Sequence, residues 1–514
     1  MSLNEKKESG VAAGPVAEAD PQLLSENPGE LEEQFETRDT ESEKRLAGLY
    51  EQYGATWDGP NDPNDPYNWP EWRKVLIGII FSVGQLVTLM SASILAAALG
   101  DISRDLGIDA STAQITLSVY FLGLGIGPFF IAALCEMNGR KNIWIISNLW
   151  YILWNSLCPV GKLKGLMIVG RLFAATGAGA GIVLTGPVMA DMYRAKDRGK
   201  SLAIASFLPY LGPALGPIVG GIVVDLIYWP WLFWIISIFD AFIVMLGIVV
   251  IKESYTPVLL RRKAAAQSQS ANLALSPTKW MFWYDFFSRL ITYLRRPIRL
   301  LLRRPIIQII SLLLALNFGI YTLMLSTFAT LWIDRYQQSP LIGSLHYISF
   351  SIGFCMTAQV GGRIMDIVYR RLRDRPKNKG EGRPEFRCPY MVPGVLFIPI
   401  GLFWYGWSAE NRITWIMVDI GAVIFTCGSS ILSQALLAYT LDLFGEVGAS
   451  ANAATRLLSN VLGFVFPIFA PQLYDRLGYG WGNSLLAFIF VGLGLPIPLL
   501  LWIWGDKLRS LGKR

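Results

Sequence analysis

Charged residues are scarce in this chain of 514 residues. Only 16% of them are Asp, Glu, Lys or Arg, whereas 53% are hydrophobic. Because a soluble domain has about 25% charged residues, a water-soluble fold would have to bury an excess of apolar side chains. The apolar residues instead fall in runs of about 20, the length that spans a hydrocarbon core about 30 Å thick. The composition excludes an ordinary soluble protein and predicts a membrane protein.

Residues that hold metals or perform acid–base catalysis are also few. The chain has five cysteines and one histidine, and no two cysteines form a CxxC motif. An odd number of dispersed cysteines argues against a disulfide framework or a metal centre. We therefore expect no cofactor and no metal site, and the lack of clustered histidines or paired carboxylates does not favour an enzyme. The first 73 residues contain no apolar segment of the kind found in a cleavable signal peptide.

The apolar segments form two sets of six. The first set covers 75–99, 112–134, 142–161, 165–190, 200–225 and 230–252, and the second covers 306–332, 341–366, 389–408, 412–441, 447–473 and 481–505. Helices are the expected structure, because an unpaired strand would leave backbone groups unsatisfied in lipid. Two equal sets predict an all-α polytopic membrane protein with two pseudo-symmetric six-helix halves and about twelve transmembrane helices.

Composition divides the chain into five regions. Residues 1–73 are polar, acidic and poor in aromatics, which predicts a disordered tail. The two six-helix halves are expected at 74–252 and 306–505, separated by a basic central loop at 253–305 and followed by a short tail at 506–514. In the central loop, aromatic residues from Trp280 stand beside arginines. That pattern is typical of a helix on the inner leaflet, or of a helix packed against the bundle.

The loop charges predict the orientation. If the N-terminus is cytoplasmic, inner loops carry 24 Lys and Arg residues and outer loops carry 6. Cytoplasmic loops are enriched in these residues, so both termini and the central loop are expected in the cytoplasm. Topology thereby explains the net charge of +7, and no nucleic-acid partner is expected.

A short charged motif occurs at equivalent places in the two halves. The second helix ends in Glu136, followed by Gly139, Arg140 and Lys141; the eighth ends in Asp366, followed by Arg370. Acid and base at i and i+4 share one helix face. We expect a cytoplasmic latch that holds basic residues across the seam between the halves in one conformation. Ordinary charged helix ends are the alternative.

The fifth apolar segment carries a stripe of small residues. Gly212, Gly216 and Gly220 recur every four residues, beside Gly221 and two prolines, Pro213 and Pro217. Such a stripe lets two membrane helices approach closely, and the prolines bend the helix. The pattern predicts close packing at a moving seam, although static packing produces the same stripe.

Two charged residues lie inside apolar segments. Arg171 stands about two turns into the fourth segment and Asp240 lies near the middle of the sixth. Charges inside a membrane are costly and tend to be functional. We expect Arg171 to act in proton coupling or in a structural ion pair. Asp240 is either a protonatable site or a group hydrogen-bonded to a neighbouring helix. Arg456 is expected near a helix end, where it extends to the interface or forms a pair.

These motifs resemble those of the major facilitator superfamily, and within it the fungal twelve-helix drug:proton antiporters, over roughly residues 57–510. The sequence from Glu136 to Lys141 resembles the family's loop motif, Arg171 with the glycines that follow resembles its helix-four motif, and Leu211–Gly221 resembles its antiporter motif. The segments around Glu253 and Arg387 resemble subfamily signatures. The order of these motifs along the chain makes the match specific.

The resemblance implies proton-coupled export of drugs, toxins or secondary metabolites by alternating access. The expected partners are a small-molecule substrate, protons and the lipid bilayer, and the protein is expected to be a monomer in the plasma membrane, with the vacuolar membrane as an alternative. A polyamine or organic-acid exporter, or a nutrient uptake carrier of the same fold, is the second hypothesis. An ATP-driven pump is not favoured, because Arg194 stands where a Walker loop ending at Gly199, Lys200 and Ser201 needs its first glycine.

Overall fold

The computed structural model describes residues 43, 45–194, 208–269, 279–376, 382–444 and 448–511. These residues form helices and no β-strand, as expected where every backbone group must be satisfied without water. Part of the predicted segment 200–225 and the Gly199–Ser201 sequence lie outside the described residues.

The first half is a bundle of six long helices. These are α2 (Glu71–Ser93), α4 (Ala110–Asn138), α5 (Arg140–Leu157), α6 (Lys164–Met192), α8 (Gly212–Leu226) and α9 (Trp231–Val250). Helix α6 packs against α4 and α5, while α2 packs against α8 and α9. The short helices η3 (Ile94–Ala97) and α3 (Leu99–Leu106) connect α2 to α4.

The second half has the same number of membrane-length segments. Its helices are α12 (Pro305–Thr330), α14 (Ile348–Arg373), α15 (Cys388–Glu410), α16 (Trp415–Phe444), α17 (Gly448–Gly494) and α18 (Pro496–Ser510). Helix α17 reverses at Gly478, whose φ of 70° and ψ of 175° are not helical. It therefore forms two segments, and α18 continues the second of them.

Length and composition alone identify ten candidate membrane spans in the described residues. The difference from the twelve expected has two causes. The run from Ser450 to Ser510 is one candidate but turns back at Gly478. Helix α5 is absent from the ten; its 18 residues begin with Arg140 and Lys141, and at 1.5 Å per residue it is about 27 Å long. With these two corrections the described helices form two halves of six.

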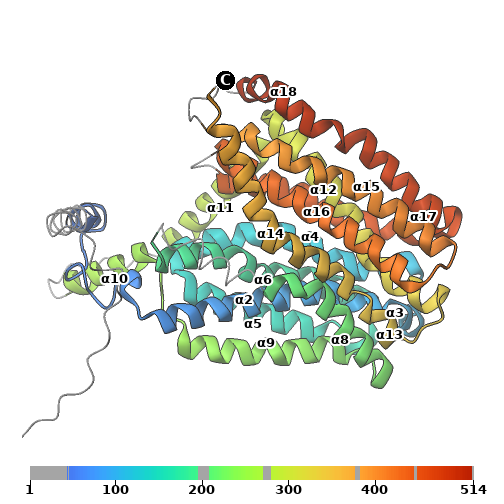
Figure 1. The fold of residues 1–514 in the computed structure, drawn as a ribbon. Coiled ribbons are helices and arrows are strands. Elements are labelled where there is room, and N and C mark those ends of the chain that lie inside the picture. The colour runs from blue at the N-terminus through green and yellow to red at the C-terminus, as the bar shows by residue number, and fades with distance from the viewer. Residues whose placement is uncertain are drawn as a thin grey trace, which may run out of the picture.

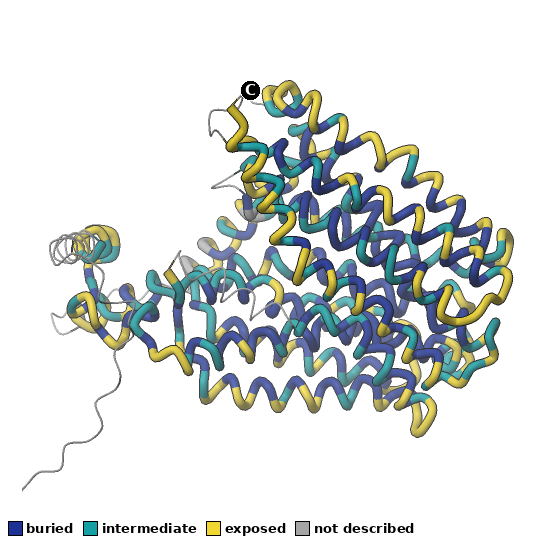
Figure 2. Tube along the Cα trace, in the orientation of Figure 1, coloured by how far each residue is buried: buried dark blue, intermediate teal, exposed yellow. Residues whose placement is uncertain are grey.

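The two halves converge at one end and diverge at the other (Figure 1). We call the end that carries α10 (Thr256–Gln269), α11 (Lys279–Arg303) and the last residues of α18 the terminal face. The other end, which carries α3 and α13 (Pro340–Leu345), is the opposite face. Figure 2 shows buried residues between the helices and exposed residues along the outer helix surfaces, where large apolar side chains such as Phe242, Met245 and Val249 would meet lipid.

The expected disorder of the first 73 residues is wrong for residues 45–70. Trp57 and Trp69 are only 5% and 6% exposed, and Lys263 of α10 donates to the Thr56 carbonyl at 2.9 Å and to Asp58 at 2.6 Å. The two tryptophans supply the apolar burial that the overall composition of the segment does not suggest.

Helix α11 combines features of both alternatives for the central loop. Phe286 and Leu290 are buried against Ala133 of α4, and the helix also contacts α17 of the second half. A second stripe that includes Trp280, Phe287 and Ile291 is exposed. The helix therefore packs on the bundle through one face and presents an apolar face on the other side.

Candidate functional site

The halves touch at the opposite face. A Cβ atom added to Gly221 of α8 would lie 2.6 Å from the Pro340 carbonyl oxygen and would also meet Ser344, both in α13 of the second half. Nearby, Gln472 of α17 donates to Ser111 of α4 at 3.3 Å. Such close contacts leave no room for a solute between α8 and α13 in this conformation.

The predicted glycine stripe packs tightly, but within the first half. A Cβ at Gly212 would collide with Leu89, and one at Gly216 would lie 2.7 Å from the Met90 carbonyl oxygen. At Gly220 the obstacle is the carbonyl of Ile94. These neighbours belong to α2 and η3, so the contact across the seam is made by Gly221 and not by the stripe itself.

A central cavity lies between the two halves. It has a volume of about 140 Å³, and its wall combines α2, α4, α6 and α8 with α12 and α17. Most of the wall is apolar: Phe121 and Leu124 come from α4, and Phe318 and Tyr321 come from α12. The polar side chains Arg456 and Asn460 of α17 also line it. This lining is typical of a small-molecule site, whereas the volume in this conformation is below the roughly 300–1,000 Å³ of such sites.

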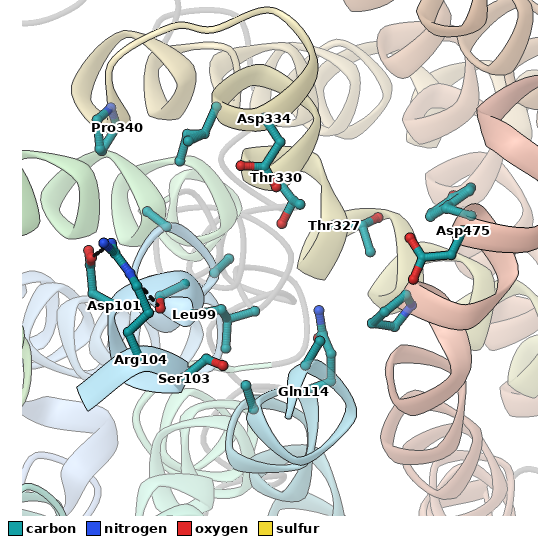
Figure 3. Close-up of a pocket in the computed structure, with 18 of the residues that line it drawn as sticks. Leu99, Asp101, Ser103, Arg104, Gln114, Thr327, Thr330, Asp334, Pro340 and Asp475 are labelled. Carbon is teal, nitrogen blue, oxygen red and sulfur yellow. Dashed lines mark hydrogen bonds and ion pairs between the residues drawn. The ribbon is translucent and has the colours of Figure 1, made fainter. Parts of the chain in front are cut away.

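A second cavity lies at the opposite face (Figure 3). It measures about 730 Å³ and is bounded by α3 and α4 on one side and by α12, the turn after it and α17 on the other. Asp334 and Asp475 line it, while Asp101 in the same wall is paired with Arg104. This acidic cavity and the central one share no lining residue, and both are formed between the halves.

Arg171 is fully buried inside the first half, away from both cavities. Its Nη2 donates to the Ser91 carbonyl at 2.8 Å, and its guanidinium lies 4.3 Å from the centre of the Tyr120 ring. Its Nη1 has no hydrogen-bond partner in the described residues. The structural ion pair considered for Arg171 is thus not present in the described part of the chain.

Asp240 of α9 is also fully buried, and neither of its carboxyl oxygens has a hydrogen-bond partner in the described residues. The alternative of a carboxyl group bonded to a neighbouring helix is therefore not what this conformation contains. Tyr120 and Tyr151 lie within electrostatic range of both Asp240 and Arg171. The two charged residues predicted from the sequence thus share one buried polar region of the first half without being paired to each other.

At the terminal face of the first half, Arg140 joins α5 to α6 and to the segment that precedes α10. Its Nε donates to Asp191 of α6 at 3.3 Å, and its guanidinium lies over the Tyr255 ring at 4.2 Å. The Glu253 carboxylate accepts from the backbone N–H groups of Arg140 at 2.8 Å and Lys141 at 3.2 Å. This caps the N-terminus of α5, where free N–H groups attract an anion. Lys141 reaches the Ile248 carbonyl at 2.9 Å.

The acid of this motif has a different partner from the one expected. Glu136 pairs with Arg289 of α11 at 3.9 Å, and both side chains are about a third exposed. Gly139 has a φ of 94°, and a Cβ atom there would collide with the Glu253 carboxylate. The glycine is therefore required by the cap as well as by its backbone conformation.

The second half has a corresponding network around Arg387. This arginine precedes α15 and contacts two carboxylates, Asp366 at the end of α14 at 3.0 Å and Asp442 at the end of α16 at 2.9 Å. Arg370, which the spacing suggested as the partner of Asp366, is exposed. Beside this network Arg509 of α18 pairs with Glu385 at 3.2 Å.

Sequence reasoning missed Asp191 and treated Glu253 and Arg387 only as parts of signatures. It placed Asp442 near a helix end, where it would extend to the interface or form a pair, and the pair with Arg387 agrees with the second alternative. A usable signal existed, because Asp191 and Asp442 stand at the ends of the fourth helices of their halves. In each half an arginine at the start of the third helix meets an acid at the end of the fourth. Neither network crosses the seam in this conformation; each ties together helices of one half.

Two bundles of six membrane-spanning helices with a cavity between them define a polytopic membrane transporter. The sequence profile of the Major Facilitator Superfamily matches residues 81–467. The chain is 36% identical over 465 residues to the efflux pump vrtL of Penicillium aethiopicum, covering 89% of this chain and 90% of that protein. It is 38% identical to the probable efflux pump mfs2 of Aspergillus flavus, covering 81% and 98%. The chain belongs to the Major Facilitator Superfamily.

Solved structures agree on the fold. A crystal structure of a D-xylose-proton symporter superposes with a TM-score of 0.62 at 15% identity, covering 83% of this chain and 97% of that one. A POT family transporter crystallised with 5-aminolevulinic acid gives a TM-score of 0.61 at 14% identity, covering 86% and 97%. At such identities the likeness concerns the arrangement of helices alone.

Proposed function

We propose that this chain is a proton-coupled exporter of small organic molecules that works by alternating access. The observation that carries the proposal is the central cavity, which both halves line and which the contact between α8 and α13 separates from the opposite face. Rocking the halves about this cavity would exchange the side on which it opens. The names of the two fungal relatives, both efflux pumps, favour export over uptake.

The terminal face is cytoplasmic in this proposal. The count of 24 inner against 6 outer Lys and Arg residues supports that orientation, as does the gathering of α10, α11 and the C-terminal residues at one end of the bundle. The protein would act as a monomer in the plasma membrane, with the vacuolar membrane as the alternative. Export would then begin from a conformation whose halves diverge toward the cytoplasm.

The proton would be carried in the first half at Asp240, with Arg171 nearby. An ionised carboxylate without a partner is very costly in an apolar interior, and Asp240 has no described partner. Taking up a proton removes that cost. The Arg171 guanidinium, which keeps its charge, would favour release of the proton whenever helix movement brings the two side chains closer.

The test is transport in liposomes with an imposed pH gradient and no nucleotide, using a panel of labelled aromatic compounds. Export should require the gradient and stop on addition of an uncoupler. Asp240→Asn should abolish gradient-driven export but keep exchange of substrate across the membrane. Asp225→Asn, at an exposed acid on α8, should behave like the wild type. ATP hydrolysis stimulated by substrate, or export indifferent to the gradient, would contradict the proposal.

A further inference from the structure

The described lining of the central cavity includes a basic side chain. Arg456 lies about two turns from the start of α17, and it lines the cavity rather than the end of the bundle. Arg456 is exposed, and the residues that line the cavity with it come from both halves. Arg456 was expected near a helix end, extended to the interface or paired; in the described residues it instead lines the cavity and has no ion-pair partner.

The guanidinium of Arg456 makes no ion pair or side-chain hydrogen bond among the described residues. The arginines of the two terminal-face networks and of the first-half interior differ from it: Arg140, Arg387 and Arg509 contact carboxylates, and Arg171 is held by backbone carbonyls. Tyr210 lies within electrostatic range of Arg456 and carries no formal charge as a neutral phenol. A cation at membrane depth without a counter-charge is costly, so an anion that enters the cavity would relieve this cost.

The rest of the wall describes the other part of such a ligand. Phe121 and Phe318 meet edge to face with ring centres 5.5 Å apart, and Tyr321 stands beside Phe318 at 6.0 Å. Aromatic walls of this kind favour planar rings, and a guanidinium binds a carboxylate through two parallel hydrogen bonds. Asn460, one turn along α17 from Arg456, donates one amide N–H to the Arg456 carbonyl at 2.9 Å, and the second N–H of this NH₂ group is left to donate to the same anion.

The charge of the cavity also separates the hypotheses on substrate class. No described residue that lines the central cavity is acidic, and Asp240 is buried inside the first half, outside the lining. A polyamine would therefore meet a cation and no described counter-charge. We infer that the central cavity selects aromatic organic anions, with Arg456 as the residue that binds their carboxylate or phenolate. This inference rests on the proposed function and names its substrate class.

The inference predicts a difference between an acid and its neutral analogue. Purified full-length protein would be titrated with 1-naphthoate, anthracene-2-carboxylate and the matching amides, with the quenching of tryptophan fluorescence as the measure of binding. Wild type should bind at least one carboxylate at least tenfold more tightly than its amide. Arg456→Gln should remove that preference and leave the affinity for the amide unchanged, whereas Arg456→Lys should keep part of it. Arg476→Gln, at an exposed arginine of the same helix outside both cavities, is the matched control.

Three results would overturn the inference: no preference for the carboxylates in the wild type, an unchanged preference in Arg456→Gln, or an equal loss of acid and amide in that variant. The last would mean that the arginine only shapes the cavity. Gradient-driven export of the amides without preference for the acids would defeat the inference and leave the proposed function intact. Selective binding of the acids without gradient-driven export would support the inference and contradict the proposed function.

Discussion

At the scale of single residues, the start of α5 depends on one glycine. Gly139 has φ 94° and ψ 171°, a region that only glycine adopts readily and that costs other residues about 1–3 kcal/mol. The carboxylate of Glu253 fills the place where a side chain would begin. The backbone conformation and the cap formed by Glu253 therefore both require glycine at this position.

We predict that Gly139→Ala destabilises the first half by about 1–3 kcal/mol and lowers transport, because the new Cβ displaces the Glu253 carboxylate from the N–H groups of α5. The melting temperature of the purified protein in detergent measures this effect. Gly165→Ala is the control, since a Cβ there meets open space and its φ is not positive. Equal melting temperatures for the two variants would show that the cap contributes nothing.

At the scale of helices, α8 has two packed faces with different partners. The Gly212–Gly216–Gly220 stripe lies against α2 and η3 in the same half, while Gly221 lies against α13 across the seam. A bulky residue on the first face should loosen one bundle. A bulky residue on the second face should change the relative position of the two bundles, and alternating access depends on that movement.

The pair Gly216→Leu and Gly221→Leu should separate these effects. Both should insert, because leucine favours the membrane. Gly216→Leu should lower the melting temperature and abolish transport. Gly221→Leu should keep the melting temperature near that of the wild type but hold the opposite face open, so that a cysteine at Thr330 in the opposite-face cavity labels faster from outside. Wild-type labelling and transport in Gly221→Leu would mean that the contact with α13 is incidental.

Much of the helical architecture could be predicted from the sequence, because segment length and apolar composition are dictated locally by the bilayer. Side-chain partners could not. The spacing of Asp366 and Arg370 suggested a pair, yet Asp366 contacts Arg387, 21 residues away. Likewise the position of Arg456 in the sequence indicated how far along the helix it lies, but not which way its side chain points. Which face of a helix meets the cavity depends on how the other helices pack, and apolar runs that are hydrophobic all round carry little periodic signal for it.

At the scale of the whole molecule, the terminal face is held by separate networks. Arg140 ties α5 to α6, and Arg387 ties the start of α15 to α14 and α16. The pair of Glu136 with Arg289 connects the first half to α11, which also contacts α17 of the second half. In this conformation the halves diverge at that face (Figure 1), and α11 contacts α4 of the first half and α17 of the second. The latch proposed for Glu136 and Asp366 would have to change partners when the halves close.

We predict that Asp366→Asn and Glu136→Gln shift the balance between the two access states without unfolding the protein. Asp366→Asn removes one of the two carboxylates that hold Arg387, and Glu136→Gln removes the described partner of Arg289 on α11; both changes weaken contacts at the terminal face. Coupling of about 1–3 kcal/mol is typical of such transitions and changes populations about 5- to 150-fold. The measure is the labelling rate of a cysteine at Ile182, which lines the central cavity and is 45% exposed.

The double variant decides whether the two acids act on one transition. If both bias closure of the terminal face, their effects on the labelling rate should combine to less than the sum of the separate free-energy changes, because coupled residues do not add. Asp225→Asn, on an exposed acid far from either network along the chain, should leave the rate unchanged. Wild-type labelling and wild-type export in both single variants would mean that Glu136 and Asp366 are solvated helix ends. Their equivalent positions would then reflect the duplication of the halves, and closure of the terminal face would have to depend on α11 or on residues other than these carboxylates.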